Sequence, residues 1–419
     1  MPQTLYRFGI DPSDPSAKAT IPTTIVTNAR IEVLWSAWCD LIHTTLNGDG
    51  TRSINYLGTS LNASQQLDVS QSLLSSGYPL QFFGTAMHDG VRGHIANSKV
   101  TIYGTPAEKA TLGDHYRDVA VWSSPYHLHQ SVSMCGDGSL LVACRHKQRP
   151  KPGSEDTISE PHSITSLVKE HPSNAHHGQE TKHPKPQTIS YVASLRELQD
   201  QYSRTDPAKS VASFAPTQLV VNATTATALD QEGRVYTRTT DPRYPTCLGR
   251  AHTGTSTFEP VPYLSETRIT KIASGGYMTA AVSAEGELFL WGQANPGTKG
   301  ELGVLHRLDY ASDVEEARKT TIQSDGMTDD DVRCLVIYIQ GKEAMAYDVA
   351  VGFGHILVAA RDDLGNRVVF GAGSGSEGQL GISGISDFCE EFSELEALRN
   401  KDIVQMKATG WTSLVVISE

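Results

Sequence analysis

Two stretches of the chain, residues 269–303 and 347–381, have nearly the same pattern. Each contains an alternating apolar run, a Gly-rich corner, a second apolar run, a turn with Gly, a third run ending in Gly, and a loop closing on Leu-Gly. Such self-similarity at a period of tens of residues is typical of one supersecondary unit copied around a ring or along a solenoid. The pattern therefore predicts an all-β repeat protein.

Fainter copies of the same pattern extend over the rest of the chain. In chain order, the seven copies span residues 31–58, 80–104, 118–145, 210–238, 269–303, 347–381 and, split between the two ends of the chain, 403–418 with 5–9. A unit shared by both ends closes a ring and removes the open sheet edges of a linear array. We therefore expect residues 1–419 to form one seven-bladed β-propeller, with four-stranded antiparallel blades and the N- and C-terminal strands in one blade.

Three insertions interrupt the copies. Residues 146–190 are rich in His, Pro and Lys with almost no apolar periodicity, so they are predicted to be disordered. Residues 304–346 form an acidic insertion. Residues 386–401 place Phe and Leu near helical spacing and are predicted to be a helix packed on a propeller face.

Composition favours some partners over others. The formal net charge of −12 argues against a broad phosphate-binding surface, so no direct nucleic-acid contact is expected and a basic protein partner is favoured. The six cysteines form no CxxC pair, which indicates a reducing compartment. With no signal pattern and no membrane-spanning run, we expect a soluble, monomeric propeller in the cytoplasm, the nucleus or both.

Five aromatic residues fall at the corner after the first strand of a copy: Trp38, Tyr126, Tyr277, Phe353 and Trp411. If the copies align, these corners lie around one end of the propeller. Trp and Tyr often anchor interfaces, because they bury a large area with few rotamers to restrict. The corners are therefore candidates for binding a partner. The alternative is that these rings simply wedge between the blades.

The glycines of the two clear copies are expected to be structural: Gly275, Gly292, Gly303, Gly352, Gly371 and Gly381. Residues 373–378 formally match the dinucleotide motif GxGxxG, but the helix that such a loop requires does not follow. Six histidines lie in residues 146–190 without the spacing of a zinc site. We therefore predict no cofactor, no metal and no catalytic residue.

The two clear copies resemble the repeat of the regulator of chromosome condensation family. The likeness lies in Gly275 to Thr279, Trp291-Gly292 and residues 300–303, and again in Gly352 to His355, Phe370-Gly371 and residues 378–381. It is specific over roughly the last 210 residues and loose over the first 145. The resemblance implies a seven-bladed propeller whose terminal strands share one blade.

The resemblance also implies two kinds of function. The first is a noncatalytic interaction scaffold, similar in character to the fungal alpha-tubulin suppressor type. That type is implicated in tRNA wobble-uridine and diphthamide modification through a small zinc-binding protein, and other single-domain members bind a chromatin demethylase. The second is guanine-nucleotide exchange on a Ran-like small GTPase, the founding activity of the family. The repeat motif itself does not choose between these partners.

Overall fold

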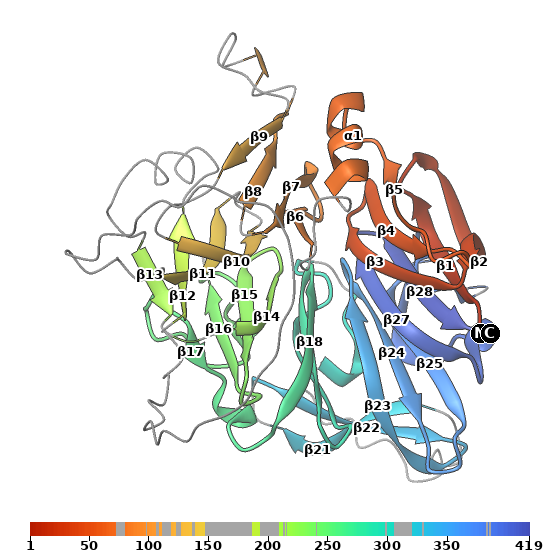
Figure 1. Ribbon diagram of the computed structural model, residues 1–419. Coiled ribbons are helices and arrows are strands. Elements are labelled where there is room, and N and C mark those ends of the chain that lie inside the picture. The colour runs from red at the N-terminus through yellow and green to blue at the C-terminus, as the bar shows by residue number, and fades with distance from the viewer. Residues whose placement is uncertain are drawn as a thin grey trace, which may run out of the picture.

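The computed structural model describes most of the chain. The described residues are 1–72, 80–97, 99–105, 109–110, 119–122, 127–135, 139–146, 187–192, 209–212, 214, 216–239, 241–297, 300–305, 321–328, 331–382, 384 and 387–419. In this part of the chain the strands are joined into six antiparallel sheets (Figure 1). No helix in the described residues has the length and apolarity needed to cross a bilayer.

Both ends of the chain lie in one sheet. Its strands run in the order β2 (Asp14–Asn28), β1 (Gln3–Asp11), β28 (Thr412–Ser418) and β27 (Asp402–Thr409). Gln3 pairs with Ser418, and the register continues without a bulge to Gly9 opposite Thr412. The predicted pairing of the two terminal strands in one unit is therefore confirmed.

Four further sheets follow the chain in order. The first contains β3 (Arg30–Ser36), β4 (Asp40–Leu46) and β5 (Arg52–Gly58). The second contains β6 (Gln81–Thr85), β7 (Gly90–Ala96), β8 (Lys99–Tyr103) and β9 (Val119–Trp122). The third contains β10 (His127–Met134), β11 (Leu140–His146), β12 (Gln187–Val192) and β13 (Lys209–Ala212). The fourth contains β14 (Pro216–Val221), β15 (Thr225–Asp230), β16 (Val235–Thr239) and β17 (Glu259–Pro260).

The last sheet has nine strands and contains both clear sequence copies. One part comprises β18 (Ile269–Gly275), β19 (Tyr277–Ser283), β20 (Leu288–Gln293), β22 (Arg333–Ile339) and the flanking β21 (Thr321–Thr328). The other comprises β23 (Lys342–Val351), β24 (His355–Arg361), β25 (Arg367–Ser374) and β26 (Phe388–Glu394). A tight turn at Gln340 and Gly341, both at positive φ, joins the two parts.

The first strand of each unit contacts the first strand of the next. These contacts run from β27 to β3, β6, β10, β14, β18 and β23, and from β23 back to β27. The second strands are almost entirely buried, because each is covered on both faces by neighbouring units. This burial explains runs such as residues 412–418 and 356–360, which are apolar or small throughout.

The structure differs from expectation at the three insertions. Residues 386–401 form strand β26 and a short 3-10 turn at Glu396–Leu398 in place of the predicted helix. Phe388 and Phe392 are four residues apart, a spacing that shares one face in a strand as well as in a helix, and the edge of β25 supplies the hydrogen-bond partners.

The described residues of the acidic segment 304–346 are also mostly sheet, whereas residues 306–320 and 329–330 lie outside the described part of the chain. The segment contains β21, β22 and the start of β23, since β22 completes the unit of β18 to β20. The prediction of disorder over 146–190 is wrong at both ends, because His146 is the last residue of β11 and Gln187 to Ser190 pair with that strand. The remaining residues of that prediction, 147–186, lie outside the described residues. Helix α1 (Ala63–Ser72) was not anticipated from the sequence.

The repeat glycines lie where the backbone of one strand approaches another. Gly292 has φ +103, and a Cβ there would collide with the carbonyl oxygen of Tyr277. A Cβ at Gly275 would likewise meet the carbonyl oxygen of Val351. The other four predicted glycines face side chains of neighbouring elements: Gly303 faces Glu391, Gly352 faces His355, Gly371 faces Leu395 and Gly381 faces Phe8.

Candidate functional site

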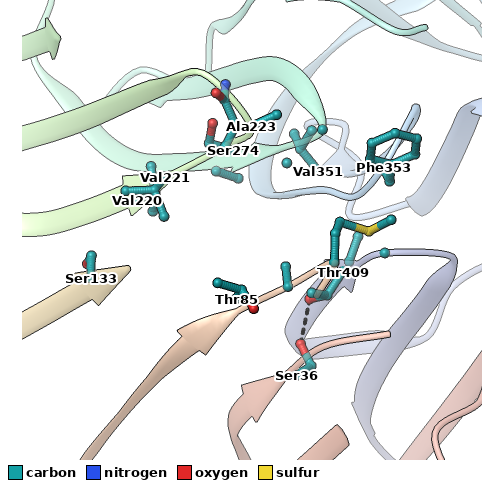
Figure 2. Close-up of a pocket in the computed structure, with 18 of the residues that line it drawn as sticks. Ser36, Thr85, Ser133, Val220, Val221, Ala223, Ser274, Val351, Phe353 and Thr409 are labelled. Atoms are coloured by element: carbon teal, nitrogen blue, oxygen red, sulfur yellow. Dashed lines mark hydrogen bonds between the residues drawn. The ribbon is translucent and has the colours of Figure 1, made fainter. Parts of the chain in front are cut away.

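A cavity of about 860 Å³ lies where the first strands converge. Its walls come from β3, β6, β10, β14, β18, β23 and β27, together with the corners that follow several of these strands. We call this cavity the channel. Figure 2 shows how its side chains point inward from the surrounding strands.

Small hydroxyl residues occupy the channel wall near the strand ends: Ser36, Thr85, Ser133, Ser274 and Thr409. Ser36 and Thr409 share a hydrogen bond of 2.6 Å between hydroxyl oxygens, which links two neighbouring first strands. Small side chains are needed here because several backbones converge on one axis. They leave open space that larger residues would fill.

Three of the predicted corner aromatics lie next to one another at one end of the channel. The ring centroids of Tyr277 and Phe353 are 6.3 Å apart, and those of Phe353 and Trp411 are 6.0 Å apart, both in edge-to-face geometry. Tyr244 extends the row, with its ring centroid 5.0 Å from that of Tyr277. All four side chains are half-buried. We call Tyr244, Tyr277, Phe353 and Trp411 the aromatic row.

The other two predicted corner residues have different outcomes. Trp38 is half-buried beside Gly410, and its indole N–H donates to the carbonyl oxygen of His88 at 2.9 Å. It therefore continues the same rim, although no ring contact joins it to Trp411. Tyr126 lies outside the described residues.

The corners of adjacent units are connected through their backbones. Phe353 N–H donates to the carbonyl oxygen of Gly410 at 2.9 Å, and Ala223 N–H donates to that of Gly276 at 2.8 Å. Trp38 N–H makes the equivalent bond to Ala86 at 3.0 Å. The same bond between three different pairs of units fixes the aromatic rings on a rigid rim.

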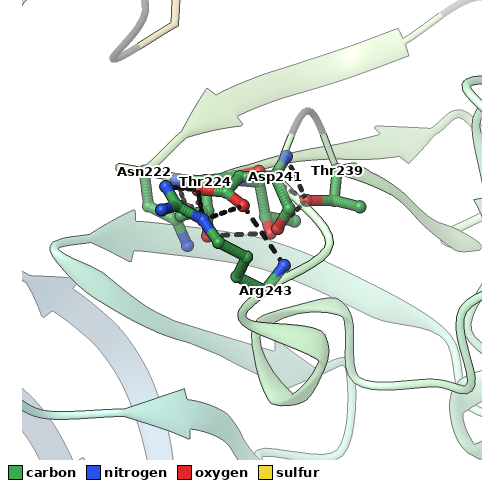
Figure 3. Close-up of polar contacts among 6 residues, drawn as sticks. Asn222, Thr224, Thr239, Asp241 and Arg243 are labelled. Carbon is green, nitrogen blue, oxygen red and sulfur yellow. Dashed lines mark hydrogen bonds and ion pairs between the residues drawn. The ribbon is translucent and has the colours of Figure 1, made fainter. Parts of the chain in front are cut away.

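A polar cluster lies beside the aromatic row (Figure 3). The guanidinium of Arg243 binds the Asp241 carboxylate through two nitrogens, with Nη2 to Oδ2 at 2.6 Å and Nε to Oδ1 at 2.8 Å. These hydrogen bonds lower the pKa of Asp241. The Thr239 hydroxyl donates to the carbonyl oxygen of Thr224 at 2.8 Å, which anchors this loop to the neighbouring corner.

The sequence analysis missed Tyr244, Asp241 and Arg243. These residues lie in the connection after β16, outside the corner position shared by the repeats. The only signal for them was the Pro-rich turn of residues 241–245, which indicates a loop but not its position at the channel mouth.

Two lysines lie deeper in the channel wall. Lys271 on β18 forms an ion pair with Asp348 on β23. Burial, with a smaller contribution from the Lys407 ammonium, lowers the pKa of Lys271 to about 7. Burial also lowers the pKa of Lys407 on β27. The Lys407 side chain keeps open surface toward the channel, so this lowering reflects the partial replacement of bulk solvent by the surrounding walls.

The described residues contain no group of three or more His, Cys, Asp or Glu side chains placed to hold a metal ion. After β25, described residues 375–382 form turns, and Gly378 packs on Ala19 of β2. The GxGxxG match therefore lies at the end of β25 and in the loop that follows it, which packs against the neighbouring sheet. The channel mouth therefore presents a rigid rim of half-exposed aromatic rings beside a cavity whose wall combines apolar, hydroxyl and lysine side chains.

Comparison with curated proteins gives a partial match, and no family model matches the chain. The E3 ubiquitin-protein ligase HERC2 of Homo sapiens is 29% identical over 151 residues, or 36% of this chain. HERC2 of Mus musculus is 28% identical over 151 residues. The match covers 2% of each ligase, so this chain spans a very small part of their length.

Comparison with solved structures gives a match over the whole chain. Prp20p from Saccharomyces cerevisiae, whose structure is described with its binding to Gsp1p and histones, has a TM-score of 0.54 at 12% identity. That match covers 100% of this chain and 92% of Prp20p. The same score and identity are found for yeast RCC1 (Prp20) bound by Kap60, with 100% and 89% coverage. At this identity the likeness concerns the fold.

Proposed function

We propose that this chain, which shares the fold of Prp20p, is a noncatalytic interaction protein of the regulator of chromosome condensation type, and that it docks a protein partner across the aromatic end of its channel. The observation that carries the proposal is the aromatic row. Three half-exposed rings on adjacent corners, joined by Tyr244 from the connection after β16, form a rigid apolar surface beside a polar rim, which is the usual composition of an interface centre.

The proposal includes a closed ring of seven blades. The nine-stranded sheet then counts as two blades joined by the turn at Gln340 and Gly341. Support comes from the cyclic contacts of the first strands and from the pairing of β1 with β28. A closed ring keeps the corner loops at fixed distances, so a partner meets a preformed surface.

The partner is proposed to be a protein. The net charge of −12 favours a basic one through long-range attraction. The family resemblance directs the first tests to two assemblies, one for tRNA wobble-uridine and diphthamide modification and one associated with chromatin. Prp20p, which shares the fold, is described as binding histones. With such partners, the protein is proposed to act in the cytoplasm, the nucleus or both.

The proposal is tested by affinity capture with quantitative mass spectrometry. The wild-type protein is compared with the double variant Phe353→Ala, Trp411→Ala and with Tyr338→Ala, a half-buried aromatic on β22 away from the rim. We expect the specific partner to be depleted at least tenfold by the double variant and retained by the control. Equal recovery with all three proteins would contradict docking on the aromatic row.

Guanine-nucleotide exchange on a Ran-like GTPase is the second candidate. It is favoured by the full-length fold match to Prp20p, which is described as binding Gsp1p. Exchange by distortion of the nucleotide site requires no catalytic constellation on the propeller. GDP release from purified Ran is the test: acceleration at substoichiometric protein supports exchange, whereas an unchanged rate leaves the scaffold role.

A further inference from the structure

The channel wall is cationic although the protein as a whole is acidic. Besides Tyr244 and Tyr277, the titratable side chains that line the channel are His88, Asp241, Arg243, Lys271 and Lys407. Asp241 and Arg243 form an ion pair at the mouth, so their charges cancel. The deeper charges are the two lysines, in a protein of net charge −12. A cavity of one charge sign with protein walls concentrates counter-ions of the opposite sign.

The two lysines differ in their partners. Lys271 has the Asp348 carboxylate as a counter-ion. The Asp348 carboxylate also accepts hydrogen bonds from Met406 N–H at 3.0 Å and from Val349 N–H at 2.9 Å. Among the described residues, no hydrogen bond or ion pair reaches Lys407 Nζ within 4.0 Å. The nearby Glu32 carboxylate lies 3.3 Å from Arg52 Nη2.

Neutral donors lie between Lys407 and the mouth. Thr409 is two residues further along β27, and alternate residues of a strand share a face, so both line the channel. Its hydroxyl pairs with that of Ser36, and either oxygen can rotate to donate to a new acceptor. Between the rim and the interior, the channel wall therefore carries the hydroxyl groups of Thr409 and Ser36 and then the Lys407 ammonium.

We infer that the channel binds an oxyanion, a carboxylate or a phosphate, on the ammonium of Lys407. The ligand must be slender and enter from the aromatic rim, because Lys407 lies three residues below Gly410, about 10 Å along an extended strand. The cavity of about 860 Å³ is within the usual size of small-molecule sites. This site is independent of the proposed partner, which would contact the rim.

The pKa values of the lysines agree with this assignment. Burial lowers the pKa of both groups, and an anion in the channel would favour their charged forms. Binding should therefore strengthen as pH falls. The other charged or titratable groups that face this region are Asp348, Glu32 and, at the mouth, Asp241, Arg243 and His88.

The test is titration of the full chain with inorganic phosphate at constant ionic strength set by sodium chloride. Binding is measured by isothermal titration calorimetry and by the change in unfolding temperature. The variants are Lys407→Gln, Lys407→Arg, which keeps the charge, and Lys99→Gln, which removes an exposed lysine of β8. A hexaglutamate peptide is titrated in parallel, to distinguish a free anion from an acidic peptide.

We expect phosphate, the peptide or both to bind the wild-type protein and raise its unfolding temperature beyond the chloride control. Lys407→Gln should weaken this binding at least tenfold, whereas Lys407→Arg and Lys99→Gln should retain it. Without ligand, Lys407→Gln should unfold at the same or a higher temperature, because it removes a desolvated cation. Failure of both probes to bind, or equal binding by Lys407→Gln, would overturn the inference.

Discussion

The two sides of the channel mouth are built differently. On one side, the corners after β18, β23 and β27 combine glycine with an aromatic ring, and the rings contact one another. On the other side, the corner after β14 is polar, and Asn222 Oδ1 accepts hydrogen bonds from Thr224 N–H at 3.0 Å and Thr225 N–H at 2.7 Å. Asn222 is buried, with its side chain bonded to its own corner and to Thr279 of β19, whereas the rings keep part of their surface open. The comparison assigns docking to the aromatic side.

The largest expected effect comes from the backbone that supports the aromatic side. Gly292→Ala should lower the free energy of unfolding by about 3 kcal/mol or more, because its Cβ would collide with the Tyr277 carbonyl at a positive φ. Gly365→Ala is the matched control: φ is also positive there, but open space surrounds the Cβ, so about 1 kcal/mol is expected. Urea unfolding measures both, and equal losses would show that the close approach is unimportant.

The next largest effect is a loss of partner affinity, and it distinguishes the aromatic side of the mouth from the polar side. Phe353→Ala removes both edge-to-face contacts of the row and should weaken partner binding by about 2 kcal/mol, the scale of an interface hot spot. Asn222→Ala should cost about 1 kcal/mol of stability by freeing the corner amides, with partner affinity unchanged. Calorimetric titration of the captured partner distinguishes them. A larger affinity loss in Asn222→Ala would reverse the assignment.

The lysines of the channel are expected to have a smaller, pH-dependent effect on the free energy of unfolding. The pKa of Lys271 is about 7 in the folded protein and near 10.5 when unfolded, so between these values the unfolded state binds more protons. The contribution of Lys271 to stability therefore rises from pH 7 to pH 10. Lys407→Met removes a repelling charge, should raise the pKa of Lys271 and should flatten this rise by roughly 1 kcal/mol or less. NMR titration of the lysines measures the pKa of Lys271 in both proteins, and an unchanged value in Lys407→Met would exclude an electrostatic interaction between the two lysines.

The smallest effect is expected at the exposed ion pair. The side chain of Arg243 is 79% exposed, and exposed pairs contribute little, so Arg243→Ala should leave the stability nearly unchanged. Arg399→Ala removes a comparable exposed pair with Glu394 away from the mouth. Thermal unfolding of both variants should be nearly equal. A distinctly larger loss for Arg243→Ala would mean that the pair organises the rim.

The fold was largely predictable because its units repeat. The pattern of residues 269–303 and 347–381 gave the strand order, and the split copy gave the pairing of β1 with β28. Segment 386–401 was mispredicted because Phe388 and Phe392 fit both a strand and a helix, and only the free edge of β25 decides between them.

The candidate site was predictable only in part. Tyr277, Phe353 and Trp411 occupy one repeat position, so alignment brought them together. Tyr244 and Arg243 lie in a connection of one unit, and Lys407 and Lys271 approach each other only across the channel. Such contacts depend on how units face one another, which a repeat motif does not encode.

Hydrogen–deuterium exchange of the protein alone and in complex with its captured partner tests the central claim most directly. Docking on the aromatic side predicts that the partner slows exchange in the corners at residues 275–279, 351–355 and 409–413, with little change at residues 222–225 on the polar side. Protection confined to the polar side or to the outer strands, with the three aromatic corners unchanged, would contradict it.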